Sequence, residues 1–443
     1  MTSTKQPEIV ELEKIIHLAG LTIPNYQRPY RWSKESTATL FNDLYLSFKS
    51  NVQEYRIGSV VLHEDAGKYN IVDGQQRLTT ISILTYCFYG YTHKDEHKSK
   101  LLSEENAFND LSSKSIVENY RVLRKKFADM PDMEKGKFIE YVLHNCTFVK
   151  IITNSEQEAF QFFDSQNSRG KELSPHDLLK SYHLREMKDE PADIKVKLVE
   201  SWESINQKNL AIFFETHMYP LVKYYRSENG LYYSASKIKT FKGISSRNTY
   251  HFSTYHKAAN LYIEHFNLEG MYEIANGEKA NQFQLTQPLI AGKRFFQYTL
   301  YYYDLCEKIT SIINSEYKPE EVSTKGSGNT YVRNLFVNIL VFFVDKFNLS
   351  ELTKARLDFF YQWAYTLRIV MQSVYLETTN KYALGLQERA NQGKNLFKVI
   401  ESIQSPSELD SIILDDENSL KVYEPKPNES NKLFWDKIFG GQK

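Results

Sequence analysis

The spacing of apolar and polar positions changes near residue 190. Before it, apolar residues at helical spacing over residues 8–19 predict a short amphipathic helix. Two β-rich segments around a turn at 65–67 predict a hairpin over residues 55–72. Further elements expected before residue 155 are helices at 34–49, 78–89, 114–129 and 134–144 and a strand at 147–152. A mixture of this kind is typical of an α+β domain.

Short cap motifs indicate where several helices begin. Ser33 is placed to cap the helix at 34–49. Residues 155–158 and 174–177 both fit the capping-box spacing, and Pro175 suits the first helical position. These motifs predict helices that end near residues 166 and 188.

From about residue 190 onward the pattern is almost entirely helical. Residues 324–330 contain Gly, Ser and Asn and indicate a loop within this half. The longest largely apolar run, residues 335–344, predicts a buried helix, because a bilayer-spanning helix needs about 20 residues. We therefore predict an α+β domain over residues 1–190 and a predominantly α-helical domain over residues 191–443.

Composition narrows the class of protein. The chain has 55 basic and 55 acidic residues, so its formal net charge is zero. This excludes nucleic-acid binders that rely on bulk positive charge, and any such contact needs a local patch. The three cysteines form no CxxC pair, which argues against a structural zinc site and is typical of reduced thiols. The first residues lack the layout of a signal peptide, so we expect a soluble, cytoplasmic protein without membrane contact.

The distribution of histidine excludes one kind of nuclease from the C-terminal third. All eleven histidines lie between His17 and His265. An HNH nuclease needs a histidine general base and usually a second histidine on its metal ion. The letters of another metal site, Asp304 followed by Glu316, Tyr317 and Lys318, lack the expected β-hairpin, so a nuclease built on them remains only an alternative.

The strongest candidate for chemistry is the segment DGQQR at residues 73–77. It stands between a predicted strand and a predicted helix, where free backbone N–H groups and the positive end of the helix dipole favour an anion. Gly74 allows close approach of a ligand, and Arg77 offers a charged fork for phosphate. Gln75 and Gln76 could bind phosphate, a base edge or water, and Asp73 could hold Mg²⁺ or orient water. The alternative is that Asp73 only caps the helix and Arg77 pairs with a surface acid.

Two further segments are candidates for ligand contact. Residues 26–32 combine Arg28 and Arg31 with aromatic side chains that could stack on a base or simply hold the loop to the domain. Residues 167–170 (NSRG), with Lys180 on the following helix, are the other candidate, and a plain helix C-cap is its alternative.

The ordered motifs resemble a known family, the N-terminal domain of GmrSD-type restriction systems, also known as domain of unknown function 262. The resemblance covers roughly residues 10–185, and its DGQQRLTT string is highly specific. The matching segments are IPNYQRPYRW at 23–32, IGS at 57–59, IVDGQQRLTT at 71–80 and FDSQNSRGKELS at 163–174.

The resemblance implies a ParB/sulfiredoxin-like α+β core that binds and hydrolyses a nucleoside triphosphate with Mg²⁺. Carried onto this chain, it implies catalytic roles for Asp73, Gln75, Gln76 and Arg77, with Asp73 on the metal ion. It further implies nucleotide contacts from Gln27, Arg28, Gly58, Ser59, Gly74, Asn167 and Arg169, and the residue types themselves add Tyr26 and Lys180 as expected contacts. Fused members of the family carry an HNH nuclease domain, and the missing histidines imply that cutting belongs to a separate chain.

The expected function is that of an NTPase subunit in a DNA-directed anti-phage defence system, and its expected partners are DNA and a separate nuclease or effector. A homo-oligomer is left open. The alternative is a non-catalytic ParB-like sensor or scaffold that binds nucleotide or DNA without turnover, and phosphate release distinguishes the two.

Overall fold

The protein is described from a computed structural model, in which the chain forms two compact units. The first unit comprises residues 1–173 and 188–203, and the second comprises residues 174–187 and 204–443. The chain therefore passes between the units more than once. The structure describes residues 6–24, 27, 29–95, 98–102, 110–154, 158, 174–187, 190–245, 247–269, 280–371, 373–426, 429 and 431–440.

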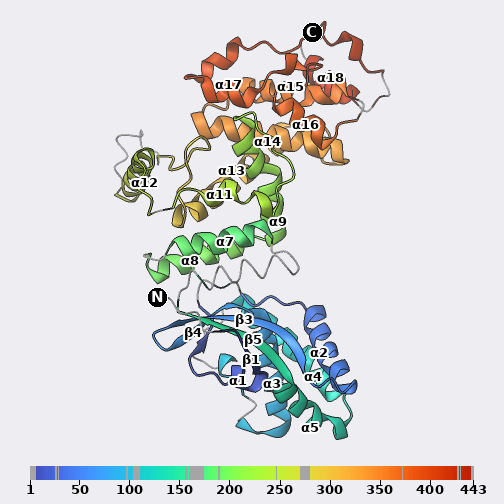
Figure 1. The fold of residues 1–443 in the computed structure, drawn as a ribbon. Coiled ribbons are helices and arrows are strands. Elements are labelled where there is room, and N and C mark those ends of the chain that lie inside the picture. The colour runs from blue at the N-terminus through green and yellow to red at the C-terminus, as the bar shows by residue number, and fades with distance from the viewer. Residues whose placement is uncertain are drawn as a thin grey trace. The chain divides into compact units, whose positions relative to one another are not determined.

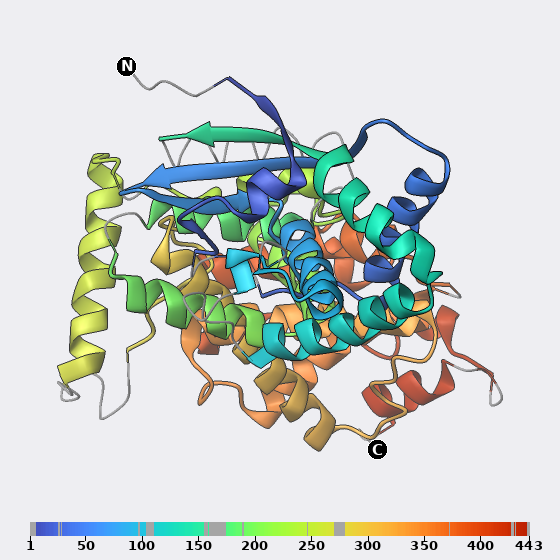
Figure 2. The same ribbon diagram turned by 90° about the horizontal axis from the view of Figure 1, so that it is seen from below.

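The first unit is built on a five-stranded mixed sheet with the strand order β1-β5-β3-β4-β2 (Figure 1). The strands are β1 Glu8–Glu11, β2 Leu21–Thr22, β3 Tyr55–Asp65, β4 Lys68–Asp73 and β5 Cys146–Thr153. The antiparallel pairing of β3 with β4 confirms the predicted hairpin. The long strand β3 also runs parallel to β5, and Figure 2 shows their two arrows side by side and pointing the same way.

The prediction of one helix over residues 8–19 is wrong at its start. Residues 8–11 form strand β1, which pairs antiparallel with β5, and only Leu12–Ile16 form helix α1. Along β1 the side chain of Ile9 is exposed and that of Val10 is buried, as expected for successive residues of an edge strand. An ion pair of 2.9 Å between Lys150 Nζ and Glu8 supports the pairing. Pairing with β5 is a contact that helical spacing alone does not reveal.

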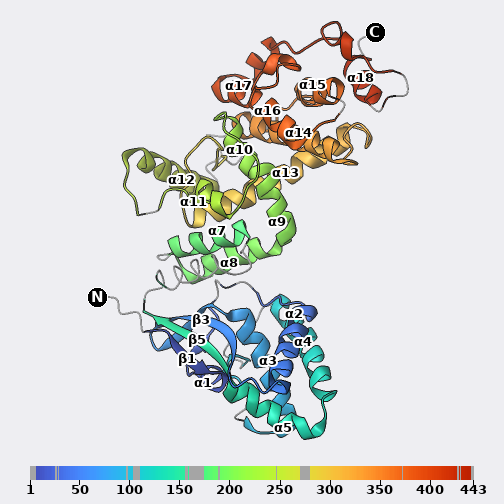
Figure 3. The same ribbon diagram turned by 45° about the vertical axis from the view of Figure 1, so that its right-hand side comes forward.

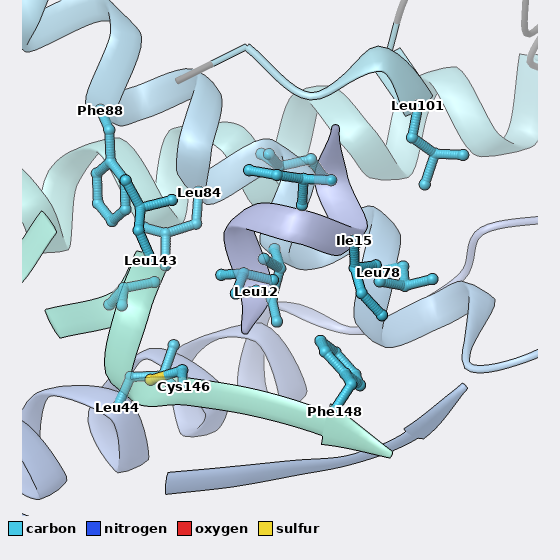
Figure 4. Packing of buried hydrophobic residues seen from close by; sticks show 14 of the residues in the cluster. Leu12, Ile15, Leu44, Leu78, Leu84, Phe88, Leu101, Leu143, Cys146 and Phe148 are labelled. Atoms are coloured by element: carbon cyan, nitrogen blue, oxygen red, sulfur yellow. The ribbon is translucent and has the colours of Figure 1, made fainter. Parts of the chain in front are cut away.

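Helices complete the first unit and close its core. They are α2 Lys34–Lys49, α3 Gln75–Thr92, α4 Asp110–Ala128, α5 Asp132–Glu140, the 3-10 turn Lys100–Leu102, the π-helical turn Tyr141–Asn145 and α8 Ala192–Ser204. The hydroxyl of Ser33 accepts the N–H of Ser36 at the start of α2, which confirms the predicted N-cap. Figure 4 shows apolar side chains of α1, α2, α3 and β5 pointing toward one another. The sheet and helix α3 are therefore held by one hydrophobic core.

The second unit is mostly helical, in agreement with the pattern after residue 190. Its helices are α7 Pro175–Glu186, α9 Gln207–Phe213, the π-helical turn Phe214–Met218, α10 Tyr219–Tyr224, α11 Lys239–Lys242, α12 His251–Glu269, α13 Lys293–Glu316, α14 Ser327–Phe347, α15 Lys354–Val370, α16 Leu376–Ala383, α17 Leu396–Ser402 and α18 Lys432–Phe439, with short 3-10 turns between some of them. Helix α14 lies beside α13 (Figure 3), and residues 335–344 within it are buried, as predicted. Within the described parts of the chain, no helix is both long and apolar enough to cross a membrane.

The start of α7 differs from the predicted capping box. Pro175 occupies the first turn as expected, but the Ser174 side chain makes no capping bond to the helix backbone. Its hydroxyl instead donates to the carboxylate of Asp177 at 2.6 Å. The short acidic side chain at the third position accepts the hydroxyl hydrogen bond, so the motif predicts where the helix begins but not its cap geometry. The other predicted capping box, at 155–158, lies largely outside the described residues.

Candidate functional site

The segment at residues 73–77 forms the passage from a strand into a helix, as predicted. Strand β4 ends at Asp73, Gly74 takes a left-handed φ of +92°, and the 18-residue helix α3 begins at Gln75. No side chain caps this helix, and its first turn contains no acidic residue. The first backbone N–H groups of an α-helix have no partner within the helix. They and the helix dipole therefore favour an anion at this point.

Two glycines allow strand β3 to lie directly against the start of α3. A methyl group on Gly74 would stand 3.1 Å from the backbone oxygen of Ser59, in a φ region that L side chains rarely adopt. A methyl group on Gly58 would overlap Nη1 of Arg77. Gly58 lies where the pairing of β3 with β5 shifts register. The bulge and the missing side chain together make room for the Arg77 guanidinium across the strand.

Asp73, at the end of β4, and Arg77, in the first turn of α3, face each other. The distance between Arg77 Nη2 and Asp73 Oδ2 is 3.6 Å, and their side chains are 27% and 21% exposed. A pair of this exposure is partly screened by water and adds little to stability. The alternative prediction is that Arg77 pairs with a surface acid. Arg77 does pair with an acid, but this acid is Asp73 of the same β4–α3 junction. Both groups remain accessible to a ligand.

Gln75 carries an incomplete set of hydrogen bonds. The residue is only 6% exposed, and its Oε1 atom is buried without a hydrogen-bond partner among the described residues. Buried polar atoms are nearly always bonded, so an orphaned one at a helix N-terminus calls for a ligand or an ordered water. This observation is independent of the helix terminus itself.

The amides of Gln27 and Gln76 are engaged in holding the neighbouring loop. Gln27 Nε2 donates to the carbonyls of Ile71 at 3.0 Å and Val72 at 2.8 Å. Gln76 Nε2 donates to the Pro29 carbonyl at 3.1 Å, and its Oε1 accepts the N–H of Arg31 at 2.9 Å. Both glutamines thus tie the loop before α2 to the β4–α3 junction.

The aromatic loop is anchored by a buried tyrosine. Tyr30 is fully buried, and Asn119 Nδ2 donates to its hydroxyl at 2.9 Å. The Tyr30 hydroxyl is 2.7 Å from Thr80 Oγ1, which in turn donates to the Gln76 carbonyl. Burial raises the pKa of Tyr30. The prediction that an aromatic side chain of this segment holds the loop to the domain is confirmed for Tyr30.

Sequence reasoning missed the two residues that support Tyr30 and the partner of Arg31. Thr80 lies one turn after Gln76 on α3, and that spacing could have indicated a shared helix face. Asn119 on α4 gives no comparable signal. Arg31, considered for phosphate contact, instead donates to the Glu203 carbonyl at 2.9 Å and lies 3.2 Å from its carboxylate.

The other predicted contact residues divide into three groups. Gly58, Ser59 and Gly74 lie together with Asp73 and Arg77 in the first unit, as described above. Lys180 is 4% exposed on α7 and belongs to the second unit. Four residues lie outside the described parts of the chain, namely Tyr26, Arg28, Asn167 and Arg169.

The metal-binding capacity of the junction rests on Asp73. Mg²⁺ in nucleotide sites is commonly held by one or two carboxylates together with phosphate oxygens, and a single accessible aspartate beside a helix N-terminus fits that pattern. Within the described ranges, the one group of three clustered ligand side chains is elsewhere, at Glu11, Glu13 and His144, and it is partly exposed. The residues present therefore fit a metal ion brought with phosphate.

The alternative nuclease letters do not form a site. Asp304 and Glu316 both lie on α13, twelve residues apart, which separates them by about 18 Å along the helix axis. They cannot bind the same metal ion. Glu316 instead pairs with Lys354 at 3.3 Å.

Two family models match successive regions of the chain. The model of the GmrSD restriction endonuclease N-terminal domain matches residues 8–184, which include the four segments that carry the resemblance. The model of a family of unknown function, DUF7834, matches residues 194–430, more than half of the chain. No curated protein matches the chain. The chain therefore belongs to the DUF7834 family, and it carries a GmrSD restriction endonuclease N-terminal domain ahead of that region.

Proposed function

We propose that the β4–α3 junction binds the phosphates of a nucleoside triphosphate and hydrolyses it with Mg²⁺. The observation that carries the proposal is the contact of Arg77 with Gly58. A guanidinium lies across a strand glycine beside the open N-terminus of an 18-residue helix. Backbone N–H groups, the helix dipole and a guanidinium fork are the three features that proteins combine to hold phosphate.

The side chains of the junction have distinct proposed roles. Arg77 neutralises phosphate charge, and Asp73 holds Mg²⁺ or orients the attacking water. When bound, Mg²⁺ supplies further neutralisation of phosphate oxygens. Gln75 offers its unpartnered Oε1 to a water or to a donor group of the nucleotide. Gly74 and the backbone of Ser59 shape the wall against which the phosphates lie.

Gln27 and Gln76 receive a positioning role in this proposal. Both Gln76 amide atoms are occupied by the loop at Pro29 and Arg31, and Gln27 bonds the last carbonyls of β4. They hold the loop that carries Arg28, a predicted nucleotide contact. In this proposal Gln76 is needed to hold the loop in place, and it takes no part in proton transfer during hydrolysis.

The wider role is in a restriction-like defence system, which the match to the GmrSD N-terminal domain supports. We propose that the chain is a subunit of such a system, that it binds DNA, and that a separate nuclease subunit cuts the DNA. Within the described residues the letters of one candidate nuclease site stand too far apart to share a metal ion. Nucleotide binding at the junction would then set when the partner cuts.

The test is direct measurement of binding and turnover in the full chain. ATP, GTP, CTP and UTP are titrated with Mg²⁺, and released phosphate is followed. Arg77→Met and Asp73→Asn should each lose turnover, whereas Arg56→Met, on the same strand as Gly58 and paired with Glu54, should retain it. Absence of binding to all four nucleotides at millimolar concentration would overturn the proposal.

A second function, nucleotide sensing without turnover, is favoured by one specific observation. Asp73 is already paired with Arg77, and among the described residues it belongs to no cluster of three metal-ligating side chains. Hydrolytic sites often gather more than one carboxylate on the metal. Tight binding that depends on Arg77 but releases no phosphate, with or without DNA, would select this function.

A further inference from the structure

A second helix N-terminus, in the second unit, carries a set of unsatisfied polar groups. Helix α14 has 21 residues and follows Gly326, which has a φ of +86° and provides no side-chain cap. The preceding Lys325 is exposed. The first backbone N–H groups of α14 have no partner within the helix. A helix terminus alone does not define a binding site, so a site here depends on the side chains around the terminus.

Arg368, near the end of α15, brings an unpaired cation to this terminus. A methyl group on Gly328 of α14 would lie 3.4 Å from Arg368 Nη1. The Nε atom of Arg368 is buried without a hydrogen-bond partner, and no carboxylate of the described residues lies within ion-pair distance. Its guanidinium stands 5.6 Å from the ring centre of Phe434. Burial lowers the pKa of Arg368, which reflects the cost of keeping this charge out of water.

Tyr365 provides the second, independent observation. It is fully buried, and its hydroxyl has no hydrogen-bond partner among the described residues. Its ring is clamped between Tyr361 at 4.3 Å and Phe434 at 5.4 Å. The Phe434 ring against which Tyr365 stacks also lies 5.6 Å from the Arg368 guanidinium, so the phenol and the guanidinium share one aromatic neighbour. A buried hydroxyl without a partner is costly unless a ligand or water completes it.

A third unsatisfied atom lies on α14 itself. Asn329 donates through Nδ2 to the Lys325 carbonyl at 2.9 Å, but its Oδ1 atom is buried and unpartnered. Other arginines of these helices are not in this condition. Arg333 donates to Asn314 at 2.6 Å, and Arg356 pairs with Glu351 at 2.7 Å. Of these three arginines, Arg368 is the one with a buried nitrogen that has no hydrogen-bond partner among the described residues.

We propose that the N-terminus of α14, with Arg368 and Tyr365, is a phosphate-binding site in the second unit. Backbone N–H groups, the guanidinium and the phenol all donate to phosphate oxygens. The Asn329 Oδ1 atom accepts the remaining proton of a monohydrogen phosphate or phosphate monoester. The Arg368 charge then gains the counter-charge that the protein does not supply.

The proposal is independent of the nucleotide site of the first unit. The residues that carry it all belong to the second unit. The test is nevertheless performed in an Arg77→Met background, so that phosphate bound at the β4–α3 junction does not contribute. A failure to bind nucleotide at the β4–α3 junction would not affect this proposal. A failure to bind phosphate at α14 would not affect the proposed nucleotide site.

The experiment follows thermal unfolding of the full chain with increasing inorganic phosphate, at ionic strength held constant with chloride. A ligand that binds only the folded state raises Tm with concentration. We expect a phosphate-dependent rise that Arg368→Met abolishes and the control Arg356→Met retains. A rise that survives Arg368→Met, or no rise in the parent, would overturn the proposal and assign the unsatisfied atoms to bound water.

A milder variant guards against general damage to the fold. Tyr365→Phe removes one oxygen and keeps the clamped ring, so we expect phosphate affinity to fall about tenfold with no loss of Tm in the absence of ligand. Unchanged phosphate affinity in Tyr365→Phe would remove the phenol from the site and overturn the proposal as stated.

Parallel titrations identify the source of the phosphate. Inorganic phosphate, a nucleoside monophosphate and a short DNA duplex are compared in parent and Arg368→Met. The ligand whose affinity falls most in Arg368→Met represents the chemical class that the site binds. If that ligand is DNA, its affinity should also fall steeply as the salt concentration rises. Equal affinity of parent and variant for all three would overturn the proposal.

Discussion

The two units each present a helix that begins after a glycine with positive φ and has no side-chain cap. Gly74 precedes α3 in the first unit, and Gly326 precedes α14 in the second. In each case an arginine lies against a further glycine, Arg77 against Gly58 and Arg368 near Gly328. The same local parts therefore recur in an α+β unit and in a helical unit.

The two arginines differ in their surroundings. Arg77 stands 3.6 Å from Asp73 and keeps about a quarter of its side chain exposed, so its charge is balanced before any ligand arrives. Arg368 has no carboxylate at ion-pair distance among the described residues, and its Nε is buried without a partner. We propose that the helix N-terminus binds an anion in both places. The neighbouring charges decide whether the charge of the arginine is already balanced within the described residues.

The largest effect is expected from a side chain at Gly58, where the missing side chain makes space for the Arg77 guanidinium. Gly58→Ala places a methyl group onto the guanidinium and should move Arg77 off the strand. Losing its charge-assisted bonds to phosphate costs about 2–3 kcal/mol, or about 30- to 150-fold in nucleotide affinity. Titration of nucleotide measures the change. Gly90→Ala on α3, where a methyl group meets nothing within 4 Å, is the matched control and should bind normally.

The next effect tests whether Gln76 positions the loop. Gln76→Ala leaves the Pro29 carbonyl and the Arg31 N–H without their partner. We expect the free energy of unfolding to fall by about 1–2 kcal/mol, measured by denaturant titration. The exposed Gln53→Ala serves as control. Abolished turnover with unchanged stability and unchanged nucleotide affinity would contradict the positioning role and restore Gln76 as a catalytic group.

A smaller effect is expected where a buried phenol is fully bonded. Tyr30→Phe removes the hydroxyl that accepts from Asn119 and contacts Thr80. The loss should lower the free energy of unfolding by about 1 kcal/mol. Urea unfolding curves of parent and variant measure it. A variant as stable as the parent would show that this chain of hydrogen bonds does not hold the loop.

The smallest effect concerns the unpartnered phenol of the second unit. Tyr365→Phe removes a hydroxyl that has no hydrogen-bond partner among the described residues, so ligand-free stability should change by less than about 0.5 kcal/mol or should rise. The same unfolding measurement applies, and Tyr30→Phe is its counterpart. A clear loss of stability here would mean that Tyr365 has a bound water or protein partner, and it would weaken the comparison between the two units.

Local signals were sufficient for much of the fold. Ser33 caps α2 as predicted, and the β-rich segments on either side of a turn form the β3–β4 hairpin. The apolar run at 335–344 is buried within α14. Each of these features depends on residues close together in the chain. The start of α1 was predicted wrongly because residues 8–11 find their partner in β5, more than a hundred residues away.

For the candidate site, the sequence by itself determined the strand–turn–helix at 73–77 and the residue types suited to phosphate. Only the tertiary structure decided which groups are available. Gln76 is engaged by Pro29 and Arg31, Arg77 lies across Gly58, and Arg368 Nε has no hydrogen-bond partner among the described residues. The physical reason is that propensity and capping act over a few residues, whereas burial and pairing depend on segments that meet only in the folded chain.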